Sequence, residues 1–398
     1  MPHSSMKMVA APIRIRRRRH LRTSLEPVFA RQICVRFPVV RAANRLLISG
    51  AAIIAAGCVS SDTPQQPDAL GPLTLMSDVS AVSCPDGVPF VLPERIGLTA
   101  TTHSWTDDPA EDVSSYYAPL APVALYELHS DDPRFGGLSG MDFLDDDTLI
   151  IVSDDGSLIW IDVTGDTLQP ADHAYMTSLR GADGQPLDGK TYADSEGVAW
   201  NGETLFISFE RGHRVLGYDI EGCGANARGA LVTDFWSGDF GEIGTVDENQ
   251  GMEALAIRDT GELVIGVEAR QLDGAPIGVF NSNEGSVSQR LAAPELTLLV
   301  GADYVGGNTD RLYSLFRSYD PIRGNRIAIG VSTVTEDGTI GEMERLAMIG
   351  SDVTVDNFEG IAVQPVSPTT DRIVIVSDDN FSARQKTLLM VLDYTHSE

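Results

Sequence analysis

The repeat that decides the fold is clearest near the C-terminus, where residues 357–363 read NFEGIAV and residues 372–381 read RIVIVSDDNF. The carboxylate of Glu359 and the glycine beside it open one apolar run, and Asp378 closes the next. Two apolar runs of strand length separated by a polar turn are typical of a β-hairpin. The stretch therefore predicts two antiparallel strands, each with a carboxylate at one end.

Four earlier segments repeat this hairpin pattern. Their first apolar runs occupy residues 138–143, 195–200, 252–257 and, more weakly, 302–305. The second runs occupy residues 148–154, 204–210, 262–268 and 311–317. With Ser139, Glu196, Glu253, Asp303 and Glu359 taken as equivalent, successive copies are 57, 57, 50 and 56 residues apart. A unit of this length has room for four short strands, which is the size of one β-propeller blade.

The whole chain from residue 77 to residue 398 is therefore expected to be all-β and to form a single β-propeller. Five copies are visible, and the two chain ends, Val79–Thr99 and Thr387–Tyr394, contain further strand-like sequence. We expect these ends to complete one more blade, which gives six blades of four-stranded antiparallel sheet. Seven blades are the alternative. Closing the ring removes the exposed edges that an open sheet would present.

Equivalent positions in successive blades surround one axis, so the repeat predicts two rings of polar residues at the channel mouth. One ring contains Ser139, Glu196, Glu253, Asp303 and Glu359, and the other contains Asp154, Glu210, Glu268, Arg317 and Asp378. Carboxylates that converge in this way raise one another's pKa unless a cation neutralises them. Because the repeats bring no set of His or Cys residues with them, the oxygen ligands indicate Ca²⁺, or alternatively Mg²⁺, rather than zinc or copper.

The candidate site residues follow from these rings. The predicted metal ligands are Glu196, Glu253, Glu359, Asp154, Asp378, Glu210 and Glu268. Arg317 either neutralises part of the carboxylate cluster or binds an anionic substrate beside the metal. Any single acidic residue at a strand end is better interpreted as a turn residue that caps backbone donors. Three glutamates at the same offset in three repeats favour a shared site instead.

Other catalytic patterns are missing from the sequence. Residues 137–140 contain only a fragment of the Gly-x-Ser-x-Gly nucleophile motif, and neither a P-loop nor an HExxH motif occurs. His213 lies in the segment Arg211–Arg214 and is interpreted as a loop residue.

Charge excludes some partners. The chain of 398 residues has 29 basic and 57 acidic residues, but its first 57 residues hold 11 of the basic residues and a single acid, Glu26. The remainder has 18 basic against 56 acidic residues, a formal charge of about −38. A surface of this kind repels phosphate backbones and anionic lipid headgroups, so nucleic acid and electrostatic membrane docking are not expected.

Residues 1–57 are interpreted as a leader. Arg41 and Arg45 precede the apolar segment 46–56 and the dipeptide Gly57-Cys58, an arrangement that resembles a bacterial lipoprotein signal and is too short to span a bilayer. Cys58 would carry the lipid, and residues 58–76 would form a flexible tether. Residues 1–40 fit no folded pattern, which suggests a start site assigned too early. The sequence after Cys58 lacks an Asp that would retain the protein in the inner membrane, so we expect an outer-membrane anchor facing the periplasm.

Two cysteines, Cys84 and Cys223, remain in the mature chain. Exported proteins fold in an oxidising compartment, so a disulfide between these two residues is one prediction, and two unpaired thiols are the other.

Several of these motifs resemble the family described as having the esterase-like activity of phytase. The resemblance covers about Gly136–Tyr394 and is most specific at residues 137–140, 153–156, 194–197, 249–253, 357–360 and 377–381. It implies a β-propeller common among exported bacterial proteins and lipoproteins, and a hydrolase of phosphate or other esters.

Two functions are compatible with this resemblance. The first is a divalent-cation-dependent hydrolase of a small-molecule ester or phosphate ester, with Glu196 or Glu359 as general base and Arg317 helping to bind substrate. The second is a non-catalytic propeller lipoprotein that binds a ligand or protein and uses the cation to stiffen the ring. In either case we expect a monomer.

Overall fold

The computed structural model describes residues 76–108, 110–234, 249–269, 274–281, 285–294, 297–307 and 310–396. The predictions for the leader, for Cys58 and for nearly all of the tether concern residues outside these ranges. Within them, no helix has both the length and the apolar character that crossing a bilayer requires.

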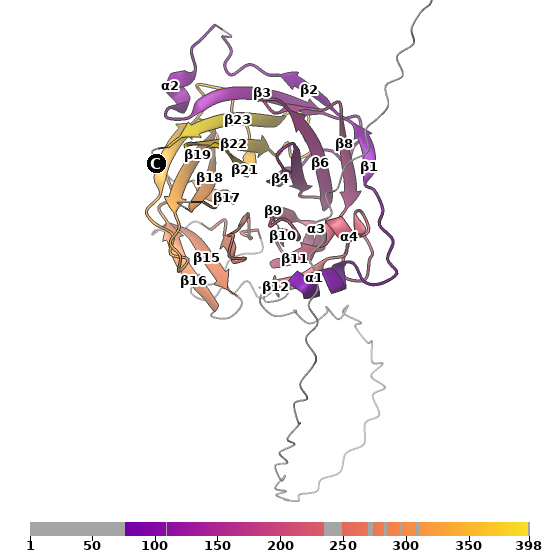
Figure 1. The fold of residues 1–398 in the computed structure, drawn as a ribbon. Helices are drawn as coiled ribbons and strands as arrows, with labels where there is room; N and C mark the ends of the chain where they lie inside the picture. The colour runs from indigo at the N-terminus through magenta and orange to yellow at the C-terminus, as the bar shows by residue number, and fades with distance from the viewer. Residues whose placement is uncertain are drawn as a thin grey trace, which may run out of the picture. The chain divides into compact units, whose positions relative to one another are not determined.

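The described strands form five antiparallel sheets around one axis (Figure 1). From the axis outward, blade 1 contains β4 (Leu138–Asp145), β5 (Thr148–Ser153), β6 (Ser157–Thr164), β8 (His173–Ser178) and β1 (Glu94–Gly97), with β7 (Gln169–Pro170) beside β6. Blade 2 contains β9 (Ser195–Trp200), β10 (Leu205–Phe209), β11 (Arg214–Tyr218) and β12 (Ala230–Asp234). Blade 3 contains β13 (Ala254–Ile257), β14 (Leu263–Gly266), β15 (Ala275–Asn281) and β16 (Gly285–Leu291).

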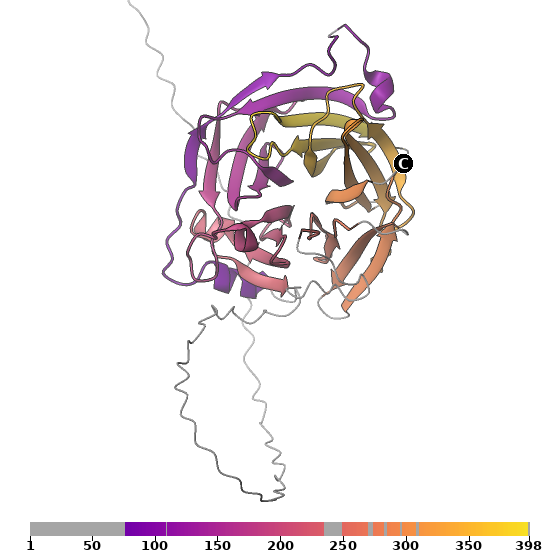
Figure 2. The same ribbon diagram turned by 180° about the vertical axis from the view of Figure 1, so that it is seen from behind.

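The last two blades complete the ring, which Figure 2 shows from the other side. Blade 4 contains β17 (Leu298–Val305), β18 (Arg311–Asp320), β19 (Gly324–Thr333) and β20 (Glu344–Ile349). Blade 5 contains β21 (Phe358–Ser367), β22 (Thr370–Ser377), β23 (Thr387–Thr395), β3 (Ala121–His129) and β2 (Thr99–Thr102). The helices among the described residues are α1 (Met76–Ser83), α2 (Ser114–Tyr117), α3 (Lys190–Ala193) and α4 (Ile220–Cys223).

The hydrophobic core is divided among the seams between neighbouring blades. In β5, Leu149 and Ile151 pack against blade 5, whereas Ile150 and Val152 pack against blade 2. Side chains alternate between the two faces of a strand, and here both faces are buried. This is why the second strand of each repeat reads as an unbroken apolar run rather than as an alternating one.

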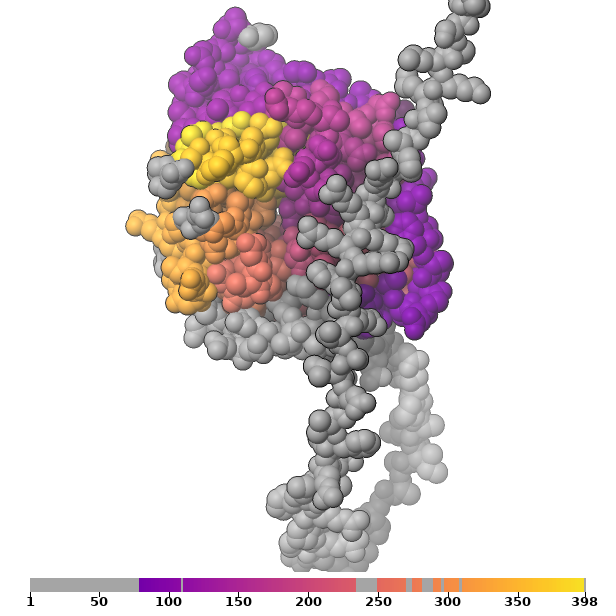
Figure 3. Space-filling view, viewed as in Figure 1, coloured from indigo at the N-terminus to yellow at the C-terminus, as the bar shows by residue number. Residues whose placement is uncertain are grey.

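The prediction of an all-β propeller is confirmed, but the prediction of six blades is wrong: the described residues form five. The fifth copy supplies only the inner strands, β21 and β22, and β23, β3 and β2 supply the outer strands of that same blade. The predicted role of Val79–Thr99 is also wrong: this segment begins in α1, its strand β1 pairs with β8 of blade 1, and only Thr99 belongs to blade 5. β23 pairs with β3 from Thr387 opposite Leu128 to Asp393 opposite Ala121, which closes the ring. Figure 3 shows the C-terminal segment beside early parts of the chain. The blade that Thr387–Tyr394 was expected to complete and the blade of the fifth copy are therefore one blade.

The segment before β1 is fastened to the outside of blade 2. Val79 of α1 packs in the core between blades 2 and 3. A disulfide joins Cys84 to Cys223 at the end of α4, with 5.5 Å between the two Cα atoms. The covalent link holds the start of the propeller domain against blade 2.

Candidate functional site

An acidic cavity of about 190 Å³ opens at one end of the channel. It is lined by Ser139, Asp154, Lys190, Asp194, Glu196, Glu210, Arg211, Asn249, Glu253, Glu268, Arg317, Glu359, Asp378 and Asn380. Nine of the ten residues in the two predicted rings are among them, including every predicted metal ligand and Arg317. His213 is buried in the turn after β10 and does not line the cavity.

In two of the innermost strands, β4 and β21, a β-bulge at the end nearest the channel mouth brings a residue of the first ring into the mouth. In β4 the register against β5 shifts between Leu138 and Gly140, and in β21 the register against β22 shifts between Phe358 and Gly360. The extra residue in each bulge, Ser139 or Glu359, has no partner in the neighbouring strand. Bulges redirect side chains in this way, and the small residue that follows leaves room for the neighbouring blade.

Asp303, the tenth predicted ring residue, lies elsewhere. The bulge of β17 falls between Leu299 and Gly301, so the counterpart of Glu359 in blade 4 is Val300. The sequence alignment of the fourth copy was wrong by three residues. The carboxylate of Asp303 instead accepts hydrogen bonds from the backbone N–H groups of Tyr304 and Val363, each at 2.6 Å.

The true counterpart of Asp303 is Asp142 in blade 1. Its carboxylate accepts hydrogen bonds from the backbone N–H groups of Phe143 and Trp200, each at 2.6 Å. Trp200 belongs to blade 2 and Val363 to blade 5, so both aspartates join their own blade to a neighbour. Burial raises the pKa of Asp142 to about 7 and that of Asp303 well above its ordinary value.

Two overlapping groups of carboxylates in the cavity are close enough together to hold a metal ion. Asp194, Glu196 and Glu210 form one group, and Glu210, Glu253 and Glu268 form the other; within each group the ligand oxygens lie within 4.8 Å of one another. Glu196 and Glu253 are each 7% exposed, and within the described part of the chain neither accepts a hydrogen bond nor forms an ion pair. A buried carboxylate without a partner is costly, because burial removes the water that stabilised its charge.

The electrostatics agree with this geometry. Burial, followed by the charges of Glu359 and Asp194, raises the pKa of Glu196 well above its ordinary value. Burial and the charge of Glu196 do the same for Glu253, and burial with the charge of Asp194 raises the pKa of Glu210 to about 7. A bound cation would compensate both the burial of these carboxylates and the repulsion between their charges, so these clusters can bind a metal ion.

Arg317 and Asn357 organise the opposite side of the cavity. The Nη2 atom of Arg317 lies 3.1 Å from Glu359 Oε1 and 3.2 Å from Glu268 Oε1, and Nη1 donates to Asn357 Oδ1 at 2.5 Å. Asn357 in turn donates through Nδ2 to Glu359 at 2.9 Å and to Asp378 at 3.2 Å. These contacts make Arg317 a counter-ion within the carboxylate cluster, and its other predicted role, binding an anionic substrate, stays a prediction.

Burial dominates the pKa values on this side. It raises the pKa of Glu359 to about 8 even though the neighbouring charge of Arg317 lowers it. It raises the pKa of Asp378 to about 6, against a hydrogen bond from the backbone of Asn380. Glu359 and Asp378 thus differ from Glu196 and Glu253 in having hydrogen-bond donors of their own.

A family model described as phytase-like, with the esterase-like activity of phytase, matches residues 133–381. The chain belongs to this family. A comparison with curated protein sequences finds no match.

Solved structures resemble this phytase-like propeller only distantly. Glutaminyl cyclase of Myxococcus xanthus is 14% identical, covers 76% of this chain and 98% of its own, and has a TM-score of 0.36. A gluconolactonase of Xanthomonas campestris is 11% identical with the same two coverages and a TM-score of 0.39. An endo-arabinanase of Bacillus licheniformis is 12% identical, covers 66% and 94%, and has a TM-score of 0.36. These similarities are too low to carry an activity over to this chain.

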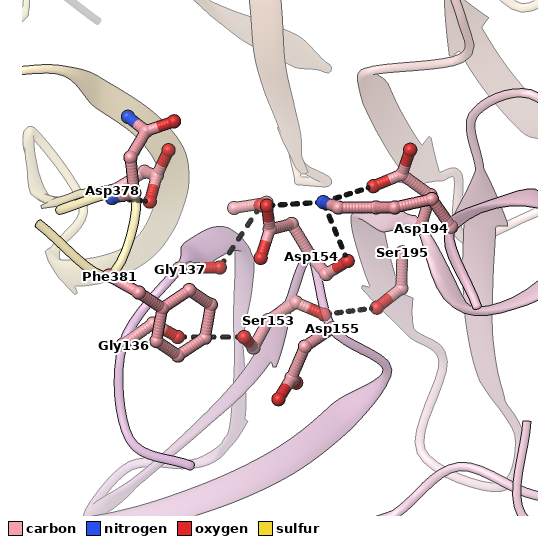
Figure 4. A network of polar contacts seen from close by, with 12 residues as sticks. Gly136, Gly137, Ser153, Asp154, Asp155, Asp194, Ser195, Asp378 and Phe381 are labelled. Carbon is pink, nitrogen blue, oxygen red and sulfur yellow. Dashed lines mark hydrogen bonds and ion pairs between the residues drawn. The ribbon is translucent and has the colours of Figure 1, made fainter. Parts of the chain in front are cut away.

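Five cavity residues of the phytase-like propeller are not among the predicted site residues: Lys190, Asp194, Arg211, Asn249 and Asn380. Three of them are charged, and Figure 4 labels Asp194. Lys190 of α3 donates through Nζ to Asp154 Oδ2 at 2.6 Å and to Asp194 Oδ1 at 2.8 Å. Arg211 donates through Nε to Asp194 Oδ2 at 2.6 Å. Asp194 could have been found, because it stands two residues before Glu196 as Asn357 stands two before Glu359. Lys190 and Arg211 lie outside the repeated strands and give no such signal.

Proposed function

We propose that this phytase-like propeller is a divalent-cation-dependent hydrolase of small-molecule esters or phosphate esters, which acts at the acidic channel mouth. The observation that carries the proposal is the pair of buried carboxylates without partners, Glu196 and Glu253, one in each of two possible ligand groups that share Glu210. Membership in the phytase-like family supports the ester substrate.

The residues present fit a hard cation. Asp194, Glu196, Glu210, Glu253 and Glu268 would hold it, and Ca²⁺ is favoured over Mg²⁺ because it accepts many carboxylate oxygens in flexible geometry. When bound, the cation would supply Lewis-acid polarisation of the ester oxygen. The ligand groups offer no nitrogen or sulfur, which argues against zinc or copper.

The remaining residues have separate tasks. Glu359 is the better candidate for general base, because Asn357 and Arg317 fix its orientation, whereas Glu196 has no such support and fits a ligand role. As base, Glu359 would take a proton from the attacking water while the leaving oxygen departs with the bond electrons. Arg317 would hold Glu359 in place and reduce the repulsion that an anionic substrate meets in this cavity.

The test is turnover of phytate, 4-nitrophenyl phosphate and 4-nitrophenyl acetate by the mature protein, with Ca²⁺, with Mg²⁺ and with a chelator. We expect turnover of at least one substrate that a chelator abolishes and Ca²⁺ restores. Glu359→Gln should lower kcat by roughly a hundredfold or more, the usual contribution of a general base, while Ca²⁺ still binds. Absence of turnover for all three substrates, or turnover unaffected by the chelator, contradicts the proposal.

A second candidate is a non-catalytic propeller in which the cation only stabilises the ring. The same buried carboxylates favour it, since they come from inner strands of different blades. It predicts that a chelator lowers the melting temperature while no ester is turned over. If the chelator changes neither stability nor turnover, the bound cation that both candidate functions assume is contradicted.

We also propose that the protein is a monomer anchored in the outer membrane through a lipid on Cys58, facing the periplasm. The disulfide between Cys84 and Cys223 supports an exported location, because such bonds persist in oxidising compartments. Incorporation of labelled palmitate by the wild type, but not by Cys58→Ala, is the expected result. Equal labelling of both would contradict the anchor.

A further inference from the structure

We propose that Phe381 determines the ligand specificity of the channel mouth, and that the preferred ligand, which the proposed function makes the substrate, is a monoester with an aromatic group that stacks on this side chain. The inference rests on the proposed function only in taking the acidic cavity as the binding site. It is carried by three observations: the backbone at Phe381, the surface under its ring, and the size and charge of the cavity.

The backbone at Phe381 has a conformation that bulky residues rarely adopt. Asn380 and Phe381 both have φ of 49°, in the left-handed region. Such a conformation is unfavourable for a residue with a Cβ and persists only where surrounding contacts impose it. Here Asp378 Oδ1 accepts from the Asn380 N–H at 2.5 Å, and Asp379 Oδ1 accepts from the Phe381 N–H at 2.9 Å.

The phenyl ring lies on a surface made of backbone. Figure 4 shows it against Gly136 and Gly137, near Asp154 of the cavity wall. A Cβ at Gly137 would lie 2.5 Å from Phe381 Cε2 and would also collide with Asp154, so only glycine allows the ring to lie there. Asp379 fixes this arrangement as well, since its Oδ1 accepts from the Gly137 N–H at 3.0 Å.

Phe381 is nevertheless 46% exposed. A phenylalanine that served only to seal the seam between blades 5 and 1 would gain most from full burial, because its stabilising effect grows with the apolar area removed from water. An unfavourable backbone that holds an aromatic ring half in solvent, next to the cavity, instead indicates a contact surface for a ligand.

The cavity limits what that ligand is. Its volume of about 190 Å³ is below the range of roughly 300–1,000 Å³ usual for sites that enclose a drug-sized ligand. It has room for the ester group, and the rest of the substrate must lie on the rim, where Phe381 is. Eight lining residues are acidic and three are basic, so even two divalent cations leave no excess of positive charge. A substrate with many phosphates is therefore disfavoured, and one with a single phosphate or acyl ester and an apolar remainder fits.

The experiment compares binding of phenylphosphonate and methylphosphonate, neither of which is hydrolysed, by calorimetry in the presence of Ca²⁺. Wild type should bind phenylphosphonate roughly three- to tenfold more tightly, the preference that one aromatic contact gives. Phe381→Leu should remove the preference without weakening methylphosphonate binding or lowering the melting temperature, and Phe381→Tyr should keep it. The matched control is Tyr319→Leu, because Tyr319 is 70% exposed but does not contact the glycine pair.

The outcomes separate this inference from the hydrolase proposal. If no ester is turned over but the phenyl preference exists and depends on Phe381, the hydrolase is wrong and the inference stands. If esters are turned over but Phe381→Leu keeps the phenyl preference, the inference is overturned and the hydrolase stands. Failure of both phosphonates to bind, or an equal loss for both in Phe381→Leu, also overturns the inference.

Discussion

Glu253 is a buried carboxylate at the channel mouth whose negative charge is unfavourable there. It is 7% exposed, and burial together with the charges of Glu196 and Glu268 raises its pKa well above the ordinary value. Glu253→Gln keeps the shape of the side chain and removes the charge, so the metal-free protein should melt higher, by roughly 2 °C or more. The same change should weaken Ca²⁺ binding, because it removes a ligand shared with Glu210 and Glu268.

Calorimetric scans with and without Ca²⁺ measure both effects. Glu336→Gln is the control, because Glu336 is exposed and lies outside the cavity. It should change neither the metal-free melting temperature nor the increase that Ca²⁺ produces. A lower metal-free melting temperature for Glu253→Gln would mean that its carboxylate is stabilising, contrary to the geometry described above.

At the scale of the strand, the second strand of each repeat was predictable from the sequence, because burial on both faces makes it a continuous apolar run. The bulge that brings Ser139 and Glu359 into the mouth was visible only as a polar residue beside a glycine. In β17 the bulge residue is Val300, and Asp303 three residues later imitates the acidic position of the motif. The error at the fourth copy arose because residue type and register disagree there, and register depends on pairing that a single strand does not reveal.

Asp142 and Asp303, the aspartates that join neighbouring blades, make the stability of the protein depend on pH. Burial raises the folded-state pKa of Asp142 from 3.8 to about 7, so the folded protein keeps a proton that the unfolded chain loses. Its contribution is therefore fully present below about pH 4 and is lost as the pH rises from about 4 to about 7. Asp142→Asn does not titrate, and the free energy of unfolding should fall less steeply over this interval.

Denaturant titrations at several pH values between 4 and 8 give that slope. Asp142→Asn should also be less stable at pH 4, since an amide can accept only one of the two backbone hydrogen bonds that the two carboxyl oxygens accept. Asp146→Asn, a change at an exposed residue in the turn after β4, should leave both quantities unchanged. Parallel pH profiles for wild type and Asp142→Asn would show that Asp142 is ionised throughout.

At the scale of the whole molecule, the blade count depended on a contact between the two ends of the chain. The repeat predicts the inner strands β21 and β22, but nothing in Ala121–His129 indicates that it pairs with Thr387–Thr395. The fifth copy and the C-terminal strand therefore belong to one blade, although the sequence suggested two. The prediction of the channel mouth depended less on the number of blades, because a closed ring of any number of blades brings the equivalent strand ends to one axis.

The link between Cys84 and Cys223 has the largest predicted effect on the whole domain. It closes a loop with a sequence separation of 139 and fixes the segment after α1 to blade 2. Restricting so long a loop lowers the entropy of the unfolded chain, so replacing both cysteines by serine should reduce the free energy of unfolding by about 2–5 kcal/mol. Denaturant titration of wild type and the double variant measures this difference, and adding reductant to wild type should reproduce most of it. Ester turnover at low temperature should be unchanged in the double variant, because neither cysteine lines the acidic cavity. A loss of turnover at temperatures where the variant is fully folded would mean that the position of blade 2, which carries Asp194, Glu196 and Glu210, depends on this bond.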